Sequence, residues 1–122
     1  MVNKVFLIAF IIFILDRLTK FIFLDNSKLN KGAAFNLLPG QNWLFILVAV
    51  IVIVYIILKR DLKEYQLGMG FLLGGTIGNL FDRIFYKGVI DFISIYIIPT
   101  FNLADLANII GALTIIYVME KN

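Results

Sequence analysis

The sequence predicts an all-α integral membrane protein with four transmembrane helices, a small extracytoplasmic β-rich platform, and an interfacial segment between the third and fourth helices. The first reason is composition, because 61% of the 122 residues are hydrophobic and only 16% are charged. A soluble domain of this size cannot bury so much apolar surface, so lipid must solvate part of it. The second reason is the alternation of long apolar segments with short polar connections. We expect residues 1–122 to form a single transmembrane domain.

The first two apolar segments predict spans over about residues 2–24 and 43–58. A helix needs about 20 residues to cross the hydrocarbon core, so the first span must include Asp16 and Lys20 near its far end. Lys4 precedes an apolar run, as in a secretory signal, but no small-residue cleavage site follows it. We therefore expect the first helix to remain uncleaved.

The last two apolar segments predict spans over about residues 66–85 and 101–119. The third span is rich in glycine, and small residues at such spacing allow helix backbones to approach each other closely in lipid. Pro99 and Thr100 come directly before the fourth span and provide a suitable start for a helix.

Basic residues predict the orientation of this multi-pass chain. The KRDLKE loop lies between the second and third spans, and Lys4 and Lys121 lie near the two ends. The positive-inside rule then places this loop and both termini in the cytoplasm. The connections 25–42 and 86–100 face outward, and their alternation of apolar and turn-forming residues favours short strands at the membrane surface.

The residue types present limit the chemistry. The chain has no cysteine and no histidine, which excludes disulfides, thiol nucleophiles, Ser-His-Asp triads, HExxH zinc sites and haem attachment. Catalysis must therefore use carboxylates, lysine, tyrosine or one of the two serines, Ser27 and Ser94. We expect no metal ion and no cofactor. The net charge of +3 is spread over scattered basic residues, which gives no indication of nucleic-acid binding.

Polar residues inside the first and third spans need partners, because an unpaired charge in hydrocarbon is costly. Asp16 and Lys20 are four residues apart, which predicts an ion pair that either anchors the helix end or supports a site. Asn79, Asp82 and Arg83 form a second polar patch. Either Arg83 reaches the interface with Asp82 as its counter-ion, or the patch faces a wet site, since the Asn79 amide cannot reach so far.

Asp91 and Asp105 differ from the other acids because neither has a basic partner on a continuous helix. Asp105 lies in the first turns of the fourth span, with Asn102 one turn earlier, and Asp91 lies in the segment that leads into it. Each acid alone is explained equally well as a helix cap or a surface charge. Two adjacent carboxyl groups, however, share one proton, so that one activates water and the other donates to a carbonyl oxygen. This is the chemistry of an aspartic protease.

Five segments resemble the motifs of one known family, in the same order. They are DRLTK (16–20), LNKGAAF (29–35), GGTIGNLFDR (74–83), VIDFI (89–93) and FNLAD (101–105). Together they resemble lipoprotein signal peptidase, the bacterial signal peptidase II. The chain is short for this family, and Asn36 follows GAAF where a serine is common.

The resemblance implies a membrane-embedded aspartic endopeptidase that removes signal peptides from diacylglyceryl-modified prolipoproteins and cleaves before the lipidated cysteine. It implies the bacterial cytoplasmic (inner) membrane as location, an active site near the outer face, and contact with membrane lipid. We expect a monomer, because the predicted bundle itself supplies all the proposed site residues. It also leads us to expect that the signal helix docks against Gly74 and Gly75. The implied catalytic residues are Asp91 and Asp105, and the implied substrate-binding and supporting residues are Asn79, Arg83, Asn102, Asp16, Lys20, Asn30 and Gly32.

Three alternatives remain open at this point. A small four-helix proton-coupled multidrug transporter has similar length and hydropathy, but it depends on an acid in mid-membrane, whereas Glu64 and Glu120 lie at cytoplasmic ends. A Ser-Lys peptidase would use Ser94 with Lys20 or Lys87. A membrane scaffold would tolerate replacement of both dyad acids.

Overall fold

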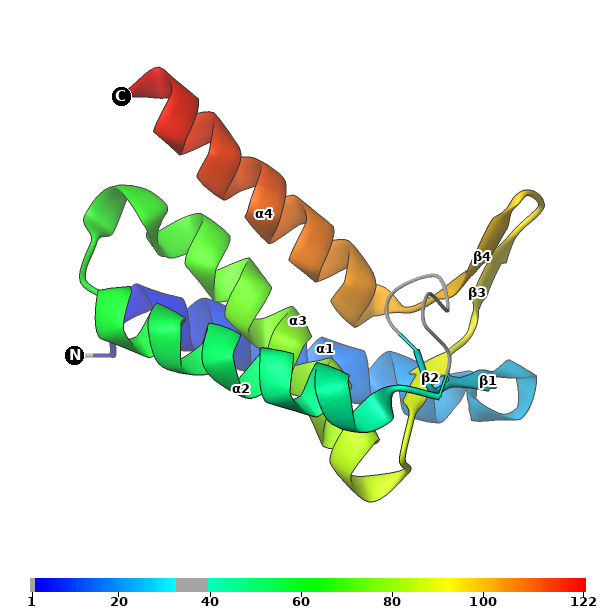
Figure 1. The fold of residues 1–122 in the computed structure, drawn as a ribbon. Coiled ribbons are helices and arrows are strands. Elements are labelled where there is room, and N and C mark those ends of the chain that lie inside the picture. Colours follow the sequence, from blue (N-terminus) through cyan, green and yellow to red (C-terminus); the bar gives the residue numbers. More distant parts are fainter. Residues whose placement is uncertain (1, 33–39) are drawn as a thin grey trace.

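The computed structural model describes residues 2–32 and 40–122. These residues form long helices and two small antiparallel sheets (Figure 1). The helices are close to the predicted spans of 2–24, 43–58, 66–85 and 101–119. They are α1 (Lys4–Ile22), α2 (Asn42–Lys59), α3 (Gln66–Phe85) and α4 (Leu103–Lys121), with 3₁₀ turns η1 (Leu24–Asn26) and η3 (Lys63–Tyr65).

The start of α4 differs from the prediction. Pro99 and Thr100 belong to a strand, and the helix begins two residues after the expected Phe101. Asn102 is the N-cap: its side chain accepts a hydrogen bond from the backbone N–H of Asp105, and the Asp105 side chain accepts one from the backbone N–H of Asn102. This reciprocal capping box pairs two N–H groups that a helix start leaves free, and it sets the boundary.

Four short strands form the two sheets. Strand β1 (Lys28–Asn30) pairs with β2 (Val89–Asp91), and β3 (Ile93–Ile95) pairs with β4 (Ile98–Phe101). The first sheet joins the two connections that the charge pattern places on one side of the membrane. The connection between the third and fourth helices, which we expected to lie at the membrane interface, therefore contains strands β2, β3 and β4. The remainder of the expected platform, residues 33–39 with Asn36, lies outside the described residues.

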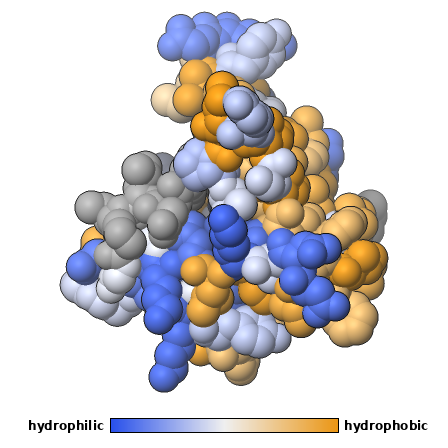
Figure 2. All heavy atoms as spheres, turned by 90° about the vertical axis from the view of Figure 1, so that its right-hand side faces the viewer, coloured by the Kyte–Doolittle hydropathy of each residue, from blue (hydrophilic) through white to orange (hydrophobic). Residues whose placement is uncertain are grey.

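The strands and the chain termini lie at opposite ends of the helices (Figure 1). Seen from the strand end, hydrophilic residues lie among hydrophobic ones (Figure 2). The sides of the helices are different, because large apolar residues point outward there: Phe10 is 64% exposed and Ile51 60%. Acids such as Asp16 and Asp82 have no exposed surface. This inverted distribution is the one that lipid, as the surrounding solvent, favours.

Two helices, α2 and α4, are long and apolar enough to cross a membrane. Helix α1 is as apolar as α4 but carries four charged residues, and α3 is less apolar because it carries Asp82 and Arg83 among many glycines. In both helices most of the charged side chains near the strand end are buried inside the protein. The charges of α1 and α3 thus belong to an interior polar site.

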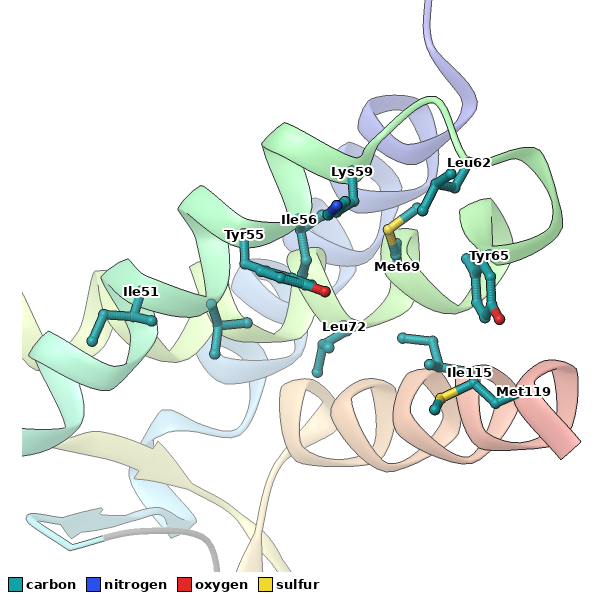
Figure 3. Close-up of a pocket in the computed structure, with 11 residues that line it drawn as sticks. Ile51, Tyr55, Ile56, Lys59, Leu62, Tyr65, Met69, Leu72, Ile115 and Met119 are labelled. Carbon is teal, nitrogen blue, oxygen red and sulfur yellow. The ribbon is translucent and has the colours of Figure 1, made fainter.

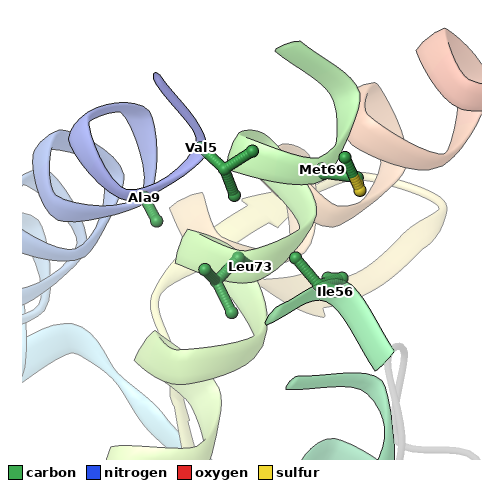
Figure 4. Packing of buried hydrophobic residues seen from close by; sticks show 5 residues of the cluster. All are labelled: Val5, Ala9, Ile56, Met69 and Leu73. Carbon is green, nitrogen blue, oxygen red and sulfur yellow. The ribbon is translucent and has the colours of Figure 1, made fainter. Parts of the chain in front are cut away.

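Helix α3 is the centre of the bundle and packs against the other three. A core of Val5, Ala9, Ile56, Met69 and Leu73 joins α1, α2 and α3 (Figure 4). Dispersion forces and close packing hold such contacts, since lipid tails are as apolar as the side chains themselves.

The glycine-rich face of α3 is occupied by the chain's own helices. A Cβ atom at Gly74 would lie 2.6 Å from Cβ of Ile12 in α1, and one at Gly75 would lie 2.4 Å from Oδ1 of Asn108 in α4. The glycines therefore permit backbone contact within the bundle. The expectation that the signal helix docks on Gly74 and Gly75 is wrong, because α1 and α4 already cover both.

An apolar pocket of about 550 Å³ lies between α2, α3 and α4, toward the ends of the helices that carry the termini (Figure 3). Its lining includes Tyr55, Lys59, Met69 and Ile115. Ile115 is ten residues along α4 from Asp105, which corresponds to about 15 Å of helix. The pocket is therefore separate from the polar residues that carry the predicted chemistry.

Candidate active site

The structure brings the two unpaired acids together at Asn102. Asp91 is the last residue of β2, and Asp105 lies in the first turn of α4. The Asn102 side-chain nitrogen Nδ2 donates to Oδ1 of Asp91 at 2.8 Å, and the Asn102 backbone N–H donates to Oδ2 of Asp105 at 3.1 Å. One residue thus contacts both carboxyl groups. All three side chains are buried.

Asn79 contacts Asp105 from the α3 side. Its Nδ2 donates to Oδ1 of Asp105 at 3.1 Å. Its Oδ1 accepts from Nδ2 of Asn102 at 3.1 Å and from Nζ of Lys20 at 3.2 Å. Both oxygens of Asp105 therefore accept N–H donors.

Asp91 has a different environment. Burial, and then the charge of Asp105, raise the pKa of Asp91 from 3.8 to about 7. Hydrogen bonds with the side chains of Asn30 and Asn102 oppose this rise without cancelling it. Its buried Oδ2 has no hydrogen-bond partner among the described residues. A pKa near 7 lets Asp91 both bind and release a proton at neutral pH, as a group that acts as a general acid must.

Four charged residues form a neutral cluster behind this pair: Asp16, Arg17, Lys20 and Asp82. Lys20 Nζ lies 2.8 Å from Oδ2 of Asp16 and 2.8 Å from Oδ2 of Asp82, so the predicted Asp16–Lys20 ion pair is confirmed. Arg17 pairs with both acids as well. The described residues contain no group of three or more acidic side chains placed to hold a metal ion.

The two acids of this cluster hold the backbone next to the two unpaired acids. Oδ1 of Asp16 accepts from the N–H of Ala104 at 3.2 Å, and Oδ2 of Asp82 accepts from the N–H of Ile90 at 3.0 Å. Ala104 precedes Asp105, and Ile90 precedes Asp91. The cluster therefore fixes the start of α4 and the end of β2 relative to each other, which positions both carboxyl groups.

The alternative with Asp82 as the counter-ion of Arg83 is wrong, because the ion pairs of Asp82 are with Arg17 and Lys20. Arg83 instead donates through Nη2 to the carbonyl oxygen of Gly32 and through Nη1 to Oδ1 of Asn42 at 3.1 Å. It thus joins α3 to the start of α2 and to the chain that follows β1. That Arg83 binds substrate remains a prediction.

Asn30 lies beside Asp91, and Gly32 contacts Asn30 and Arg83. Both are buried, and Oδ1 of Asn30 accepts from the N–H of Gly32 at 2.8 Å. The side chain of Asn30 also hydrogen-bonds Asp91. Whether Asn30 and Gly32 contact a substrate is a prediction that the contacts within the chain do not test.

Sequence reasoning missed Arg17 and Asn42. Arg17 is part of the DRLTK segment, but its partner Asp82 is 65 residues away, and spacing along one helix cannot predict such a pair. Asn42 lies at the start of the second span, next to an apolar run. A polar residue at this position could have been predicted to need a polar partner. Its amide also donates to the carbonyl oxygen of Arg83 at 3.2 Å.

A Ser-Lys pair is not supported. Ser94 lies exposed on β3, whereas Lys20 is buried in the charged cluster. The three donors of the Lys20 ammonium face Asp16, Asp82 and Asn79. Lys20 is therefore fully engaged away from Ser94, and the structure does not bring Ser94 and Lys20 together as a nucleophile and its base.

The chain is similar to known proteins over almost its whole length. The family model described as signal peptidase (SPase) II matches residues 8–120. A lipoprotein signal peptidase of Halothermothrix orenii is 33% identical, over 96% of this chain and 96% of that protein. The corresponding protein of Anoxybacillus flavithermus is 36% identical, over 92% of this chain and 83% of its own length.

Solved structures show the same architecture. A bacterial membrane enzyme determined by the in meso method at 2.3 Å resolution superposes with a TM-score of 0.85 at 29% identity, covering 99% of this chain and 90% of that one. A second, at 1.9 Å resolution, also has a TM-score of 0.85, at 27% identity, and covers 100% and 96% of the two chains.

Proposed function

This chain belongs to the signal peptidase II family, and on that premise we propose that it is an aspartic endopeptidase with Asp91 and Asp105 as its catalytic residues. Family membership makes it a bacterial membrane protease that processes prolipoproteins. The catalytic type is our proposal. The observation that supports it is that Asn102 hydrogen-bonds both carboxyl groups, and the pKa of one of them, Asp91, is raised to about 7.

The proposed reaction starts with Asp105 ionised and Asp91 protonated. Asp105 accepts a proton from water, whose oxygen attacks the scissile carbonyl carbon, while Asp91 donates its proton to the carbonyl oxygen. In the resulting diol, one hydroxyl proton returns to Asp91 as the C–N bond breaks, and Asp105 delivers its proton to the leaving nitrogen. One water is consumed, and the dyad regains its starting protonation. Asn79 and Asn102 hold Asp105 as the proton acceptor for the first step.

We further propose that all four helices cross the membrane in one domain, with both termini in the cytoplasm and the dyad near the outer face. Three observations support this orientation. The KRDLKE loop is basic, the strands lie at the opposite end from both termini (Figure 1), and the charges of α1 and α3 near the dyad are buried. A monomer is our expectation, because one chain supplies every residue of the proposed site.

The proposed substrate is a prolipoprotein whose cysteine carries diacylglyceryl, cleaved just before that cysteine. The lipid holds the substrate in the bilayer, so enzyme and cleavage site meet in two dimensions at a raised effective concentration. A dyad at the strand end of the helices, close to water, also has access to its nucleophile. Asn30, which lies next to Asp91, and Gly32, which contacts Asn30, are the candidates for contact with the substrate backbone.

A cleavage assay tests the proposal. Purified protein is incubated with a diacylglyceryl-modified precursor and, in parallel, with the unmodified precursor. We expect cleavage of the modified precursor alone. Asp91→Asn and Asp105→Asn should each reduce cleavage by at least about 10²-fold, the usual contribution of a general acid or base, while Ser94→Ala should cleave normally. Retained cleavage in either Asn variant would exclude the dyad.

A further inference from the structure

Lys20 is a buried lysine whose three donors are all engaged. Its side chain is 2% exposed, and its Nζ lies 2.8 Å from Oδ2 of Asp16, 2.8 Å from Oδ2 of Asp82 and 3.2 Å from Oδ1 of Asn79. An ammonium group has three N–H donors and no acceptor. Lys20 therefore has no donor left for a substrate, although the resemblance implied a substrate-binding role. The charge of Lys20 is balanced by the two acids, which leaves its contact with Asn79 to be explained.

The contacts with Lys20 and Asn102 together determine which end of the Asn79 amide faces Asp105. The amide oxygen accepts from Nζ of Lys20 and from Nδ2 of Asn102, and the amide nitrogen therefore points to Oδ1 of Asp105 at 3.1 Å. If the amide turned over, its NH₂ group would face the Lys20 ammonium and its oxygen would face the carboxylate. Both contacts would then be repulsive, because lysine has no acceptor and an ionised carboxylate has no donor.

We propose that Lys20 is a positioning residue: it holds the Asn79 amide with its nitrogen toward Asp105, and this keeps Asp105 a hydrogen-bond acceptor and leaves the shared proton on Asp91. The proposal rests on the proposed function, since it concerns the division of roles within the dyad. It assigns Lys20 an effect on the chemical step, transmitted through one side chain, in addition to the ion pairs that Lys20 forms in the charged cluster.

Two charge-matched double variants separate this role from a structural one. Lys20→Met with Asp82→Asn removes one cation and one acid, and leaves the Arg17–Asp16 pair. Arg17→Met with Asp82→Asn also removes one cation and one acid, but leaves Lys20 bound to Asp16 and Asn79. In both variants the amide oxygen of residue 82 can still accept from the N–H of Ile90. The two proteins therefore differ in whether Asn79 keeps its lysine.

The readouts are kcat, KM and the pH profile of kcat for cleavage of the diacylglyceryl-modified precursor. For Lys20→Met with Asp82→Asn we expect kcat to fall about 100-fold, as for a misplaced catalytic group, with KM unchanged. The acid limb of its pH profile should move to higher pH, because the ionised carboxylate of Asp105 then has one hydrogen-bond donor fewer to stabilise it. Arg17→Met with Asp82→Asn should keep the acid limb of the wild type. The charged groups around the dyad are Asp16, Arg17, Lys20, Asp82 and Arg83. The two double variants have the same net charge in this set.

A further comparison uses Asn79→Leu. Both pairs of changes are also made in a protein that already carries Asn79→Leu. If Lys20 acts through Asn79, Lys20→Met with Asp82→Asn should then lower kcat no more than Arg17→Met with Asp82→Asn does. Equal kcat values and equal acid limbs for the two double variants in the presence of Asn79 would overturn the proposal. Cleavage by Asp91→Asn or Asp105→Asn would instead overturn the dyad itself, so the two failures are distinguishable.

Discussion

Replacement of Asp91 by asparagine should stabilise the protein at neutral and alkaline pH while it abolishes activity. In the unfolded chain the carboxyl group ionises near pH 3.8, and in the folded chain near pH 7. Between these pH values the carboxyl group of Asp91 is ionised in the unfolded chain but still protonated in the folded chain. Each rise in pH therefore lowers the free energy of unfolding, until the decrease is complete above about pH 7. Asparagine has a similar shape and no charge, and it can still accept from Asn102.

The magnitude follows from the two pKa values of Asp91. A rise from 3.8 to about 7, at about 1.4 kcal/mol per unit, corresponds to at most about 4 kcal/mol of unfolding free energy. The assay is chemical unfolding in detergent micelles from pH 4 to pH 8, with the exposed Asp25→Asn as the control. The stabilisation should be largest near pH 8 and vanish near pH 4. An Asp91→Asn protein with wild-type stability at pH 8, or with a gain independent of pH, would show that folding does not raise the pKa of Asp91.

Three other predictions follow. The rate of precursor cleavage should fall above about pH 7, because Asp91 then loses the proton that it donates; a rate that stays constant to pH 9 would contradict this. Gly78→Ala should destabilise the fold by about 1–3 kcal/mol, since its Cβ would lie 2.4 Å from Oδ2 of Asp16; thermal unfolding in micelles measures the loss. Arg83→Lys should also lower the unfolding temperature, because one ammonium cannot reproduce the planar fork that reaches Gly32 and Asn42; an unchanged temperature would show that this link contributes little.

Local patterns predicted much of this structure. Helix α3 begins at Gln66 and ends at Phe85, as the apolar run indicated, and the Asp16–Lys20 pair follows from helical spacing alone. The start of α4 was missed because the capping box at Asn102 set the boundary in place of Thr100.

Contacts between distant segments were beyond the reach of such patterns. Lys20 and Asn79 are 59 residues apart, and nothing in either helix alone indicates that they meet. The glycines of α3 were correctly interpreted as a surface for close approach, but the sequence could not show that the partner is α1 and α4 rather than a substrate helix. Asp91 and Asp105, in contrast, could be singled out from the sequence because neither has a basic partner on a continuous helix.

The shared proton can be observed by infrared difference spectroscopy of the carboxyl groups, comparing wild type with Asp91→Asn between pH 5 and pH 9. We expect one protonated carboxyl group near pH 6 that is present in the wild type, absent in the variant, and lost with a midpoint of about 7. If the wild type and the variant show the same protonated carboxyl signal at pH 6, Asp91 holds no proton there, and the shared-proton mechanism is contradicted.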